Sequence, residues 1–115
     1  MFKGREKFEI DSVAGKETEF KGNLRHKKSI RIEGKFEGEI EVGGTLIIGE
    51  DAVIKANIKA KSVSIRGKVV GDVNCEGKIE LLSSASLEGK VKASDLTIAK
   101  GAFFNGECRM TPPGS

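Results

Sequence analysis

Apolar residues occupy alternate positions along most of this chain, and the alternation recurs in blocks of about seventeen residues from Ser29 to Met110. Side chains two residues apart point to the same face of a β-strand, so each block predicts about three short strands with one buried face. No stretch has the apolar spacing that an amphipathic helix requires. A fixed repeat of strand-forming segments is typical of a solenoid, whose function lies in its long faces and its ends.

Aligning the blocks gives seven columns of matching residues that are apolar or small. If each block forms one turn of a triangular coil, successive blocks stack in parallel at roughly 4.8 Å and each column becomes a ladder that points inward. We therefore predict an all-β fold, a single-domain parallel β-helix. The columns are Ile30, Leu46, Val63, Ile79 and Leu96; Ile32, Ile48, Ile65, Leu81 and Ile98; Gly34, Ala52, Gly67, Ala85 and Ala102; Phe36, Ile54, Val69, Leu87 and Phe104; Gly38, Ala56, Gly71, Gly89 and Gly106; Ile40, Ile58, Val73, Val91 and Cys108; and Val42, Ala60, Cys75, Ala93 and Met110.

Small residues and insertions predict where the coil turns. The column that contains Gly38 and Gly71 places a residue without a side chain where the backbone must turn a corner. Three blocks carry extra residues directly after their first apolar pair, at positions 49–51, 83–84 and 100–101. We expect these insertions to bulge outward at a single corner without interrupting the ladders.

An imperfect copy of the block precedes the others and sets the predicted length of the coil. Its residues Phe20, Gly22, Leu24 and His26 each lie sixteen residues before a matching position of the next block. Those positions are Phe36, Gly38, Ile40 and Val42. This copy brings the prediction to about six coils. We divide the chain into an N-terminal tail at residues 1–12, a β-helix domain at residues 13–110 and a C-terminal tail at residues 111–115, and we expect both tails to be flexible.

Composition narrows the classes of protein that the chain could represent. Its 115 residues suffice for one domain, and the absence of Trp and Tyr is unusual for a pocket that grips a ligand. No apolar run is long enough to cross a bilayer or to form a signal peptide, which predicts a cytoplasmic location. Cys75 and Cys108 both fall in inward columns, so we expect buried, reduced thiols.

The charged and reactive residues do not form a pattern that predicts catalysis. The net charge is +3, and Lys and Glu alternate at outward positions, as on solvated faces, whereas a nucleic-acid site favours one sign of charge with aromatic residues between. His26 is the single histidine, and no Ser or Cys can be placed with it and an acid in a triad. Clusters of Asp, Asn and Gly that could hold calcium are missing. We expect no enzymatic activity, no cofactor, no metal and no nucleic-acid partner.

The two ends of the coil are candidates for self-assembly. Soluble solenoids cover their terminal coils, but here the last block runs directly into Thr111 and two prolines. An uncovered end presents apolar side chains and an edge strand, which favours a polymer joint over an aggregation hazard. The predicted joint residues are Phe103, Phe104 and Met110 at the C-terminal end and Phe20 and Leu24 in the first coil.

The N-terminal tail has two interpretations, a disordered segment without a role and a weak membrane anchor. Its apolar and basic groups could enter the interface of an anionic membrane, where an apolar ring contributes about 2 kcal/mol and each basic group about 1 kcal/mol. Because a filament carries many tails, a transient contact would become a stable one. The candidate membrane-binding residues are Met1, Phe2, Lys3, Arg5, Lys7 and Phe8.

These residues and spacings resemble the bactofilins, a family of small bacterial cytoskeletal proteins. The resemblance covers nearly the whole chain and is most specific in the run from Ser29 to Ile40 and in the recurring Gly-x-Ile/Val at Gly38, Gly71 and Gly89. It implies a right-handed coil that assembles end to end into non-polar filaments without nucleotide. It also implies attachment of the N-terminal tail to the inner face of the cytoplasmic membrane. Other morphogenetic or cell-wall proteins are further expected partners.

A rival interpretation is a β-helix module that does not polymerise and binds a protein partner through a flat face. Scattered aliphatic residues on a surface are common, so this pattern alone is weak evidence. An enzyme ranks third. The outward aliphatic residues that could form such a face are Ile47, Val53, Val70 and Leu82.

Overall fold

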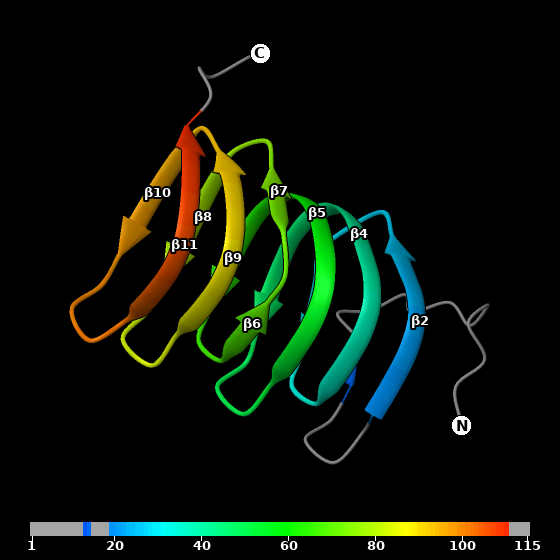
Figure 1. The fold of residues 1–115 in the computed structure, drawn as a ribbon. Helices are drawn as coiled ribbons and strands as arrows, with labels where there is room; N and C mark the ends of the chain where they lie inside the picture. Colours follow the sequence, from blue (N-terminus) through cyan, green and yellow to red (C-terminus); the bar gives the residue numbers. More distant parts are fainter. Residues whose placement is uncertain (1–12, 15–18, 111–115) are drawn as a thin grey trace.

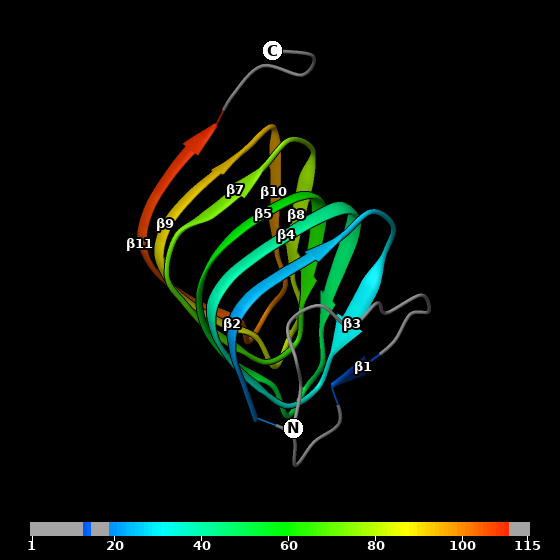
Figure 2. The same cartoon turned by 90° about the vertical axis from the view of Figure 1, so that its right-hand side faces the viewer.

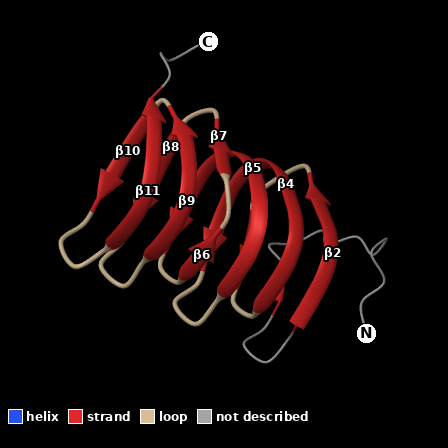
Figure 3. Ribbon diagram, viewed as in Figure 1, coloured by secondary structure: helices blue, strands red, loops and turns tan. Residues whose placement is uncertain are grey.

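The computed structural model describes residues 13–14 and 19–110, and the regular elements in this part of the chain are all β-strands (Figure 3). The strands pair in parallel throughout. They are β1 (Val13–Ala14), β2 (Glu19–His26), β3 (Ile30–Ile32), β4 (Lys35–Ile48), β5 (Val53–Ile65), β6 (Lys68–Val70), β7 (Val73–Cys75), β8 (Lys78–Leu81), β9 (Ser86–Ala93), β10 (Asp95–Ile98) and β11 (Phe103–Met110).

The strands wind into a right-handed coil with three faces (Figure 1). In Figure 2, which looks along the coil from the β2 end, the chain rises along β2, β4 and β9 and descends along β3, β8 and β10 as it recedes. The first face holds residues 19–21, 35–37, 53–55, 68–70, 86–88 and 103–105; the second holds residues 23–26, 39–42, 57–60, 73–75, 90–93 and 107–110; and the third holds residues 13–14, 30–32, 45–48, 62–65, 78–81 and 95–98.

Six rungs on each face correspond to five complete turns and most of a sixth, and the prediction of a parallel β-helix with about six coils is confirmed. The predicted columns are the ladders of this coil. On the third face Ile48 pairs with Ile32 on one side and with Ile65 on the other, and Leu81 and Ile98 continue the ladder. The first, imperfect copy also joins: Phe20 pairs with Phe36, and their rings stack with centroids 5.0 Å apart.

The interior of the coil contains apolar side chains from all three faces. Of the described residues, those that are buried are hydrophobic or glycine, and Leu46, Ile54, Ile79 and Leu87 have no solvent exposure. Burying each of these side chains stabilises the fold by about 1.5–3 kcal/mol. This free energy is larger than the intrinsic secondary-structure propensity of any single residue in a rung. The core is therefore one continuous stack rather than a central cluster.

A corner between the first and second faces depends on glycine. Gly71 has a φ of 139°, and a Cβ built on it would clash with the carbonyl oxygen of Ala56 in the rung below. Gly38, Gly89 and Gly106 share this backbone geometry in their own rungs. Ala56 belongs to the same column, but its φ is not positive, so this rung turns without the left-handed conformation. The predicted role of the glycine column is confirmed in four of its five rungs.

The three predicted insertions form tight turns at the corner between the third and first faces. Each turn is closed by a backbone hydrogen bond of 2.8–3.1 Å between residues three apart, in which the amides of Ala52, Ala85 and Ala102 donate. These three donors belong to one column, so the turns stack above one another while the ladders on either side stay in register.

The two cysteines have different environments. Cys75 is buried, its thiol donates to the carbonyl oxygen of Lys61 at 3.1 Å, and burial raises its pKa. Cys108 is exposed, so the prediction of two buried cysteines is wrong for this residue. Its side chain lies in the inward column as expected, but it belongs to the last turn, and the described part of the chain places no further rung above it.

The glycine corner generates a stability test. Substitution of Gly71 by Ala adds a Cβ at a positive φ and against a backbone oxygen, so we expect a loss of about 2–4 kcal/mol in the free energy of unfolding. The matched control is Ala56→Gly in the same column, which should cost only about 1 kcal/mol. Chemical denaturation followed by circular dichroism measures both variants, and equal losses would contradict this explanation of the corner.

Candidate assembly interface

The last described turn of the coil exposes side chains at positions that the turn before it buries. Ile98 is 46% exposed and Met110 is 52% exposed, whereas Leu81 and Ala93, which precede them in the same columns, have no exposure. Leu96, Ala102 and Phe104 are partly buried because they pack on the turn below. We call the inward residues of this turn the C-terminal layer. It comprises Leu96, Ile98, Ala102, Phe104, Cys108 and Met110.

The same end has free backbone edges. Among the described strands, β11 pairs with β9 alone and β10 pairs with β8 alone. Their outer edges carry N–H and C=O groups that can pair with another strand. The C-terminal end, where β10 and β11 lie in Figure 1, therefore combines an apolar centre with a hydrogen-bonding rim.

Phe103 does not belong to this layer, although the sequence placed it there. It pairs with Ser86 in the outward register of the first face, while its neighbour Phe104 pairs with Leu87 in the core. Successive side chains of a strand point to opposite faces, so Phe103, which is 54% exposed, projects from the side of the coil.

The first coil differs from the last in its exposure. Phe20 and Leu24 occupy the columns of Phe104 and Cys108, yet each is only 9% exposed. The predicted joint residues thus lie in two unlike environments: Met110 is exposed and Phe104 half-buried at the C-terminal end, and Phe20 and Leu24 are buried in the first coil. The candidate membrane-binding residues of the tail, from Met1 to Phe8, lie outside the described residues.

The aliphatic residues of the rival interpretation do not form one patch. Val53 and Val70 lie on the first face, and Ile47 and Leu82 lie on the third or at its end. All four are half-buried. A partner that bound a single flat face could therefore contact at most two of them.

Other surfaces offer little chemistry. A groove of about 660 Å³ runs along the second face, where amide and oppositely charged side chains such as Asn57, Lys59 and Asp72 line it. Within the described ranges no three His, Cys, Asp or Glu side chains gather as a metal site would require. Nδ1 of His26 accepts a hydrogen bond from the amide of Lys28 at 3.0 Å. No helix capable of crossing a membrane occurs in the part of the chain that the structure describes.

The register also brings together basic side chains that are distant in the sequence. On the second face Lys59 lies in one ladder with Arg25 and Glu41 on one side and with Asn74, Lys92 and Arg109 on the other. Because outward Lys and Glu alternate along the chain, the sequence read residue by residue does not show this row of basic side chains. Aligning the outward positions of the blocks as well as the inward ones would have revealed it.

Comparisons with known proteins identify the architecture. The family model Bactofilin, described as polymer-forming cytoskeletal, matches residues 12–109. A cryo-EM reconstruction of Thermus thermophilus bactofilin double helical filaments matches this fold with a TM-score of 0.80 and 29% sequence identity, and the match covers 87% of this chain and 99% of that one. None of the curated proteins compared with the chain matches its sequence. With a family match over residues 12–109 and the predicted columns stacked in its coil, this chain belongs to the bactofilins, a family of polymer-forming cytoskeletal proteins.

Proposed function

We propose that this protein is a non-enzymatic scaffold whose copies join end to end through the C-terminal layer into non-polar filaments, without nucleotide, at the inner face of the cytoplasmic membrane. The observation that carries the proposal is the exposure of the C-terminal layer: columns that are buried in the preceding turns from Ile30 to Ala93 are open to solvent at Ile98, Cys108 and Met110. A similar protein forms filaments, which supports polymerisation of this one.

Two copies meeting at their C-terminal ends would restore what each end lacks. The apolar columns of one copy would cover those of the other, and the free edges of β11 could pair with each other. Such a contact between identical surfaces is symmetric, so a filament built on it has no polarity. The second joint would then lie between first coils, where Phe20 and Leu24 belong to the core stack.

The polypeptide alone supplies every group that a joint of this kind requires. It consists of apolar side chains and backbone edges, and neither requires the charge or the shape of a bound nucleotide. This composition supports assembly without nucleotide. It also supports a structural rather than a catalytic task, with other morphogenetic or cell-wall proteins as clients of the filament.

The joint is tested by a charge in its centre. Phe104→Arg should give a folded, β-rich protein without filaments, because the guanidinium would be buried unpaired at every joint at a cost of several kcal/mol. Met110→Arg should act in the same direction from a more exposed position. The matched control is Phe103→Arg, one residue away but on the outer side of the coil, which should still form filaments. Electron microscopy reads out all three variants, and long filaments of folded Phe104→Arg protein would place the joint elsewhere.

The cysteines report on the same joint. In filaments Cys108 should be protected from a maleimide, whereas in the Phe104→Arg variant it should react within the time of an exposed thiol. Cys75 is the internal control: its raised pKa keeps the thiol protonated at neutral pH and its side chain is buried, so it should react slowly in both samples. If Cys108 is labelled equally fast in filaments and in the variant, the C-terminal layer is not covered on assembly.

Membrane attachment is tested separately from assembly. Deletion of residues 1–9, or Phe2→Glu, should strongly reduce sedimentation with anionic vesicles while filaments persist, because these residues precede the first described strand. The attraction of the basic groups should weaken as the salt concentration rises. Equal binding of filaments with and without residues 1–9 would refute the anchor.

A further inference from the structure

One corner of the coil, where the second face meets the third, carries an excess of positive charge larger than the net charge of the whole chain. The corner itself holds Lys27 and Lys28 in the first turn and Lys61 two turns later, and the ladder beside it is the row that contains Lys59. We call these residues the basic edge. It comprises Arg25, Glu41, Lys59, Asn74, Lys92 and Arg109 in the ladder and Lys27, Lys28, Gly43, Gly44, Lys61, Glu76, Gly77 and Ser94 at the corner.

The basic edge is distinct in charge from the rest of the protein. It holds seven of the chain's 20 Lys and Arg residues and two of its 17 Asp and Glu residues, which leaves thirteen basic and fifteen acidic residues elsewhere. The charged side chains of the edge are all exposed. Arg25 and Glu41 form an ion pair at 3.4 Å, so one of the two acids is already neutralised. The edge is therefore positive although the molecule as a whole is nearly balanced.

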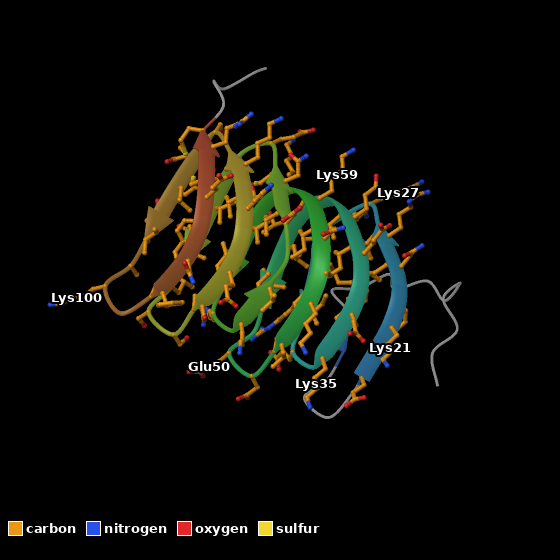
Figure 4. All side chains as sticks on the ribbon, viewed as in Figure 1. Lys21, Lys27, Lys35, Glu50, Lys59 and Lys100 are labelled. Carbon is orange, nitrogen blue, oxygen red and sulfur yellow. The ribbon has the colours of Figure 1, made fainter. Side chains whose placement is uncertain are left out.

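The arrangement is a straight ridge. Successive rungs rise by roughly 4.8 Å, so the row from Arg25 to Arg109 extends over about 24 Å along the coil axis. Figure 4 shows Lys27 and Lys59 projecting from the same upper side of the coil, whereas Lys35, Glu50 and Lys100 lie along the opposite side. A convex corner touches a flat surface along its whole length, so a planar partner can meet every cation of the row at once.

The residues of the edge also argue against other acidic partners. Besides its charged members the edge presents only Gly, Ser and Asn, so it has no apolar anchor that could form the centre of a protein interface. It has no aromatic side chain on which a base could stack. Long, flexible Lys and Arg side chains on a rigid backbone suit the headgroup region of an anionic bilayer, where attraction is electrostatic.

We propose that the basic edge is the side of the coil that faces the membrane and that it binds the headgroups of anionic lipids. This inference rests on the proposed membrane association and adds to it an orientation: the second and third faces slope away from the bilayer, and the first face points to the cell interior. A filament presents one such edge for each subunit, so weak contacts at single edges combine.

The experiment uses the full chain with four neutralised lysines, Lys27→Gln, Lys28→Gln, Lys59→Gln and Lys61→Gln together. The matched control neutralises four exposed lysines of the first face and the opposite corner, namely Lys35, Lys55, Lys68 and Lys100. Both variants keep the tail and lose the same charge. Their binding is compared with that of the unaltered protein on vesicles of phosphatidylcholine with phosphatidylglycerol and on pure phosphatidylcholine, at low and high salt, after electron microscopy has verified filaments in each sample.

We expect the edge variant to bind anionic vesicles about tenfold more weakly than the unaltered protein at low salt, with the difference shrinking as salt screens the charges. The control variant should bind within about twofold of the unaltered protein. Equal weakening of both variants would overturn the inference, since net charge alone would then explain the binding. Unchanged binding of the edge variant would overturn it while leaving the tail anchor intact, and failure of the unaltered protein to bind any vesicle would overturn both.

A second measurement reports the orientation directly. In a Cys108→Ser background, an environment-sensitive dye attached at Lys61→Cys should change its emission on anionic vesicles, and the same dye at Lys100→Cys should not. A response at position 100 but not at position 61 would reverse the proposed orientation. Duplex DNA serves as the competing anion: if it binds the edge while vesicles do not, the partner is a nucleic acid and the lipid proposal is wrong.

Discussion

Each turn of this protein can bury its apolar side chains only because another turn lies against it. A single rung has one row of inward residues and two open edges, and it has no second layer of structure to cover them. Parallel pairing solves both problems together, since the rung above supplies hydrogen-bond partners to the edge and matching side chains to the core. At the C-terminal end of the described coil this pairing stops, and the columns that stabilise the interior have no further described rung above them. Exposure of Ile98 and Met110 is therefore a direct result of the rule that buries Leu81 and Ala93.

The rule also explains why small residues recur with the same period as the large ones. Stacked turns must change direction at the same places, and at the corner between the first and second faces the carbonyl of one rung lies under the Cα of the next. Gly38, Gly71 and Gly89 accept this approach, and Ala56 shows that one rung can reach the corner with a different backbone conformation. The inward columns therefore fix the path of the backbone, and both surfaces proposed to bind partners, the C-terminal layer and the basic edge, contain positions that the core stack does not cover.

Much of this fold could be predicted from the sequence because residues at equivalent positions of the repeat form the ladders of the coil. Residues that share a column, such as Phe36, Ile54 and Val69, must stack if the blocks form turns, and the register bears this out. The exposure of Cys108 could not be read from its column, since burial depends on whether a further turn exists. The outward direction of Phe103 follows from strand alternation, but two adjacent phenylalanines near an end suggested a single apolar patch. The basic edge is recognised only when the charges of residues from different turns are added along the coil axis, which the linear sequence does not display.

The three turns closed by the amides of Ala52, Ala85 and Ala102 distinguish one corner from the other two. Their extra residues lie outside both flanking ladders, and they occupy the corner at which the first face begins, on the far side of the coil from the basic edge. Length can vary at this corner without moving any rung, as the unequal blocks already demonstrate. The corner is thus where a short epitope or a fluorogenic peptide could be inserted, so that a filament would carry labels along one line and leave its ends and its opposite ridge unmodified.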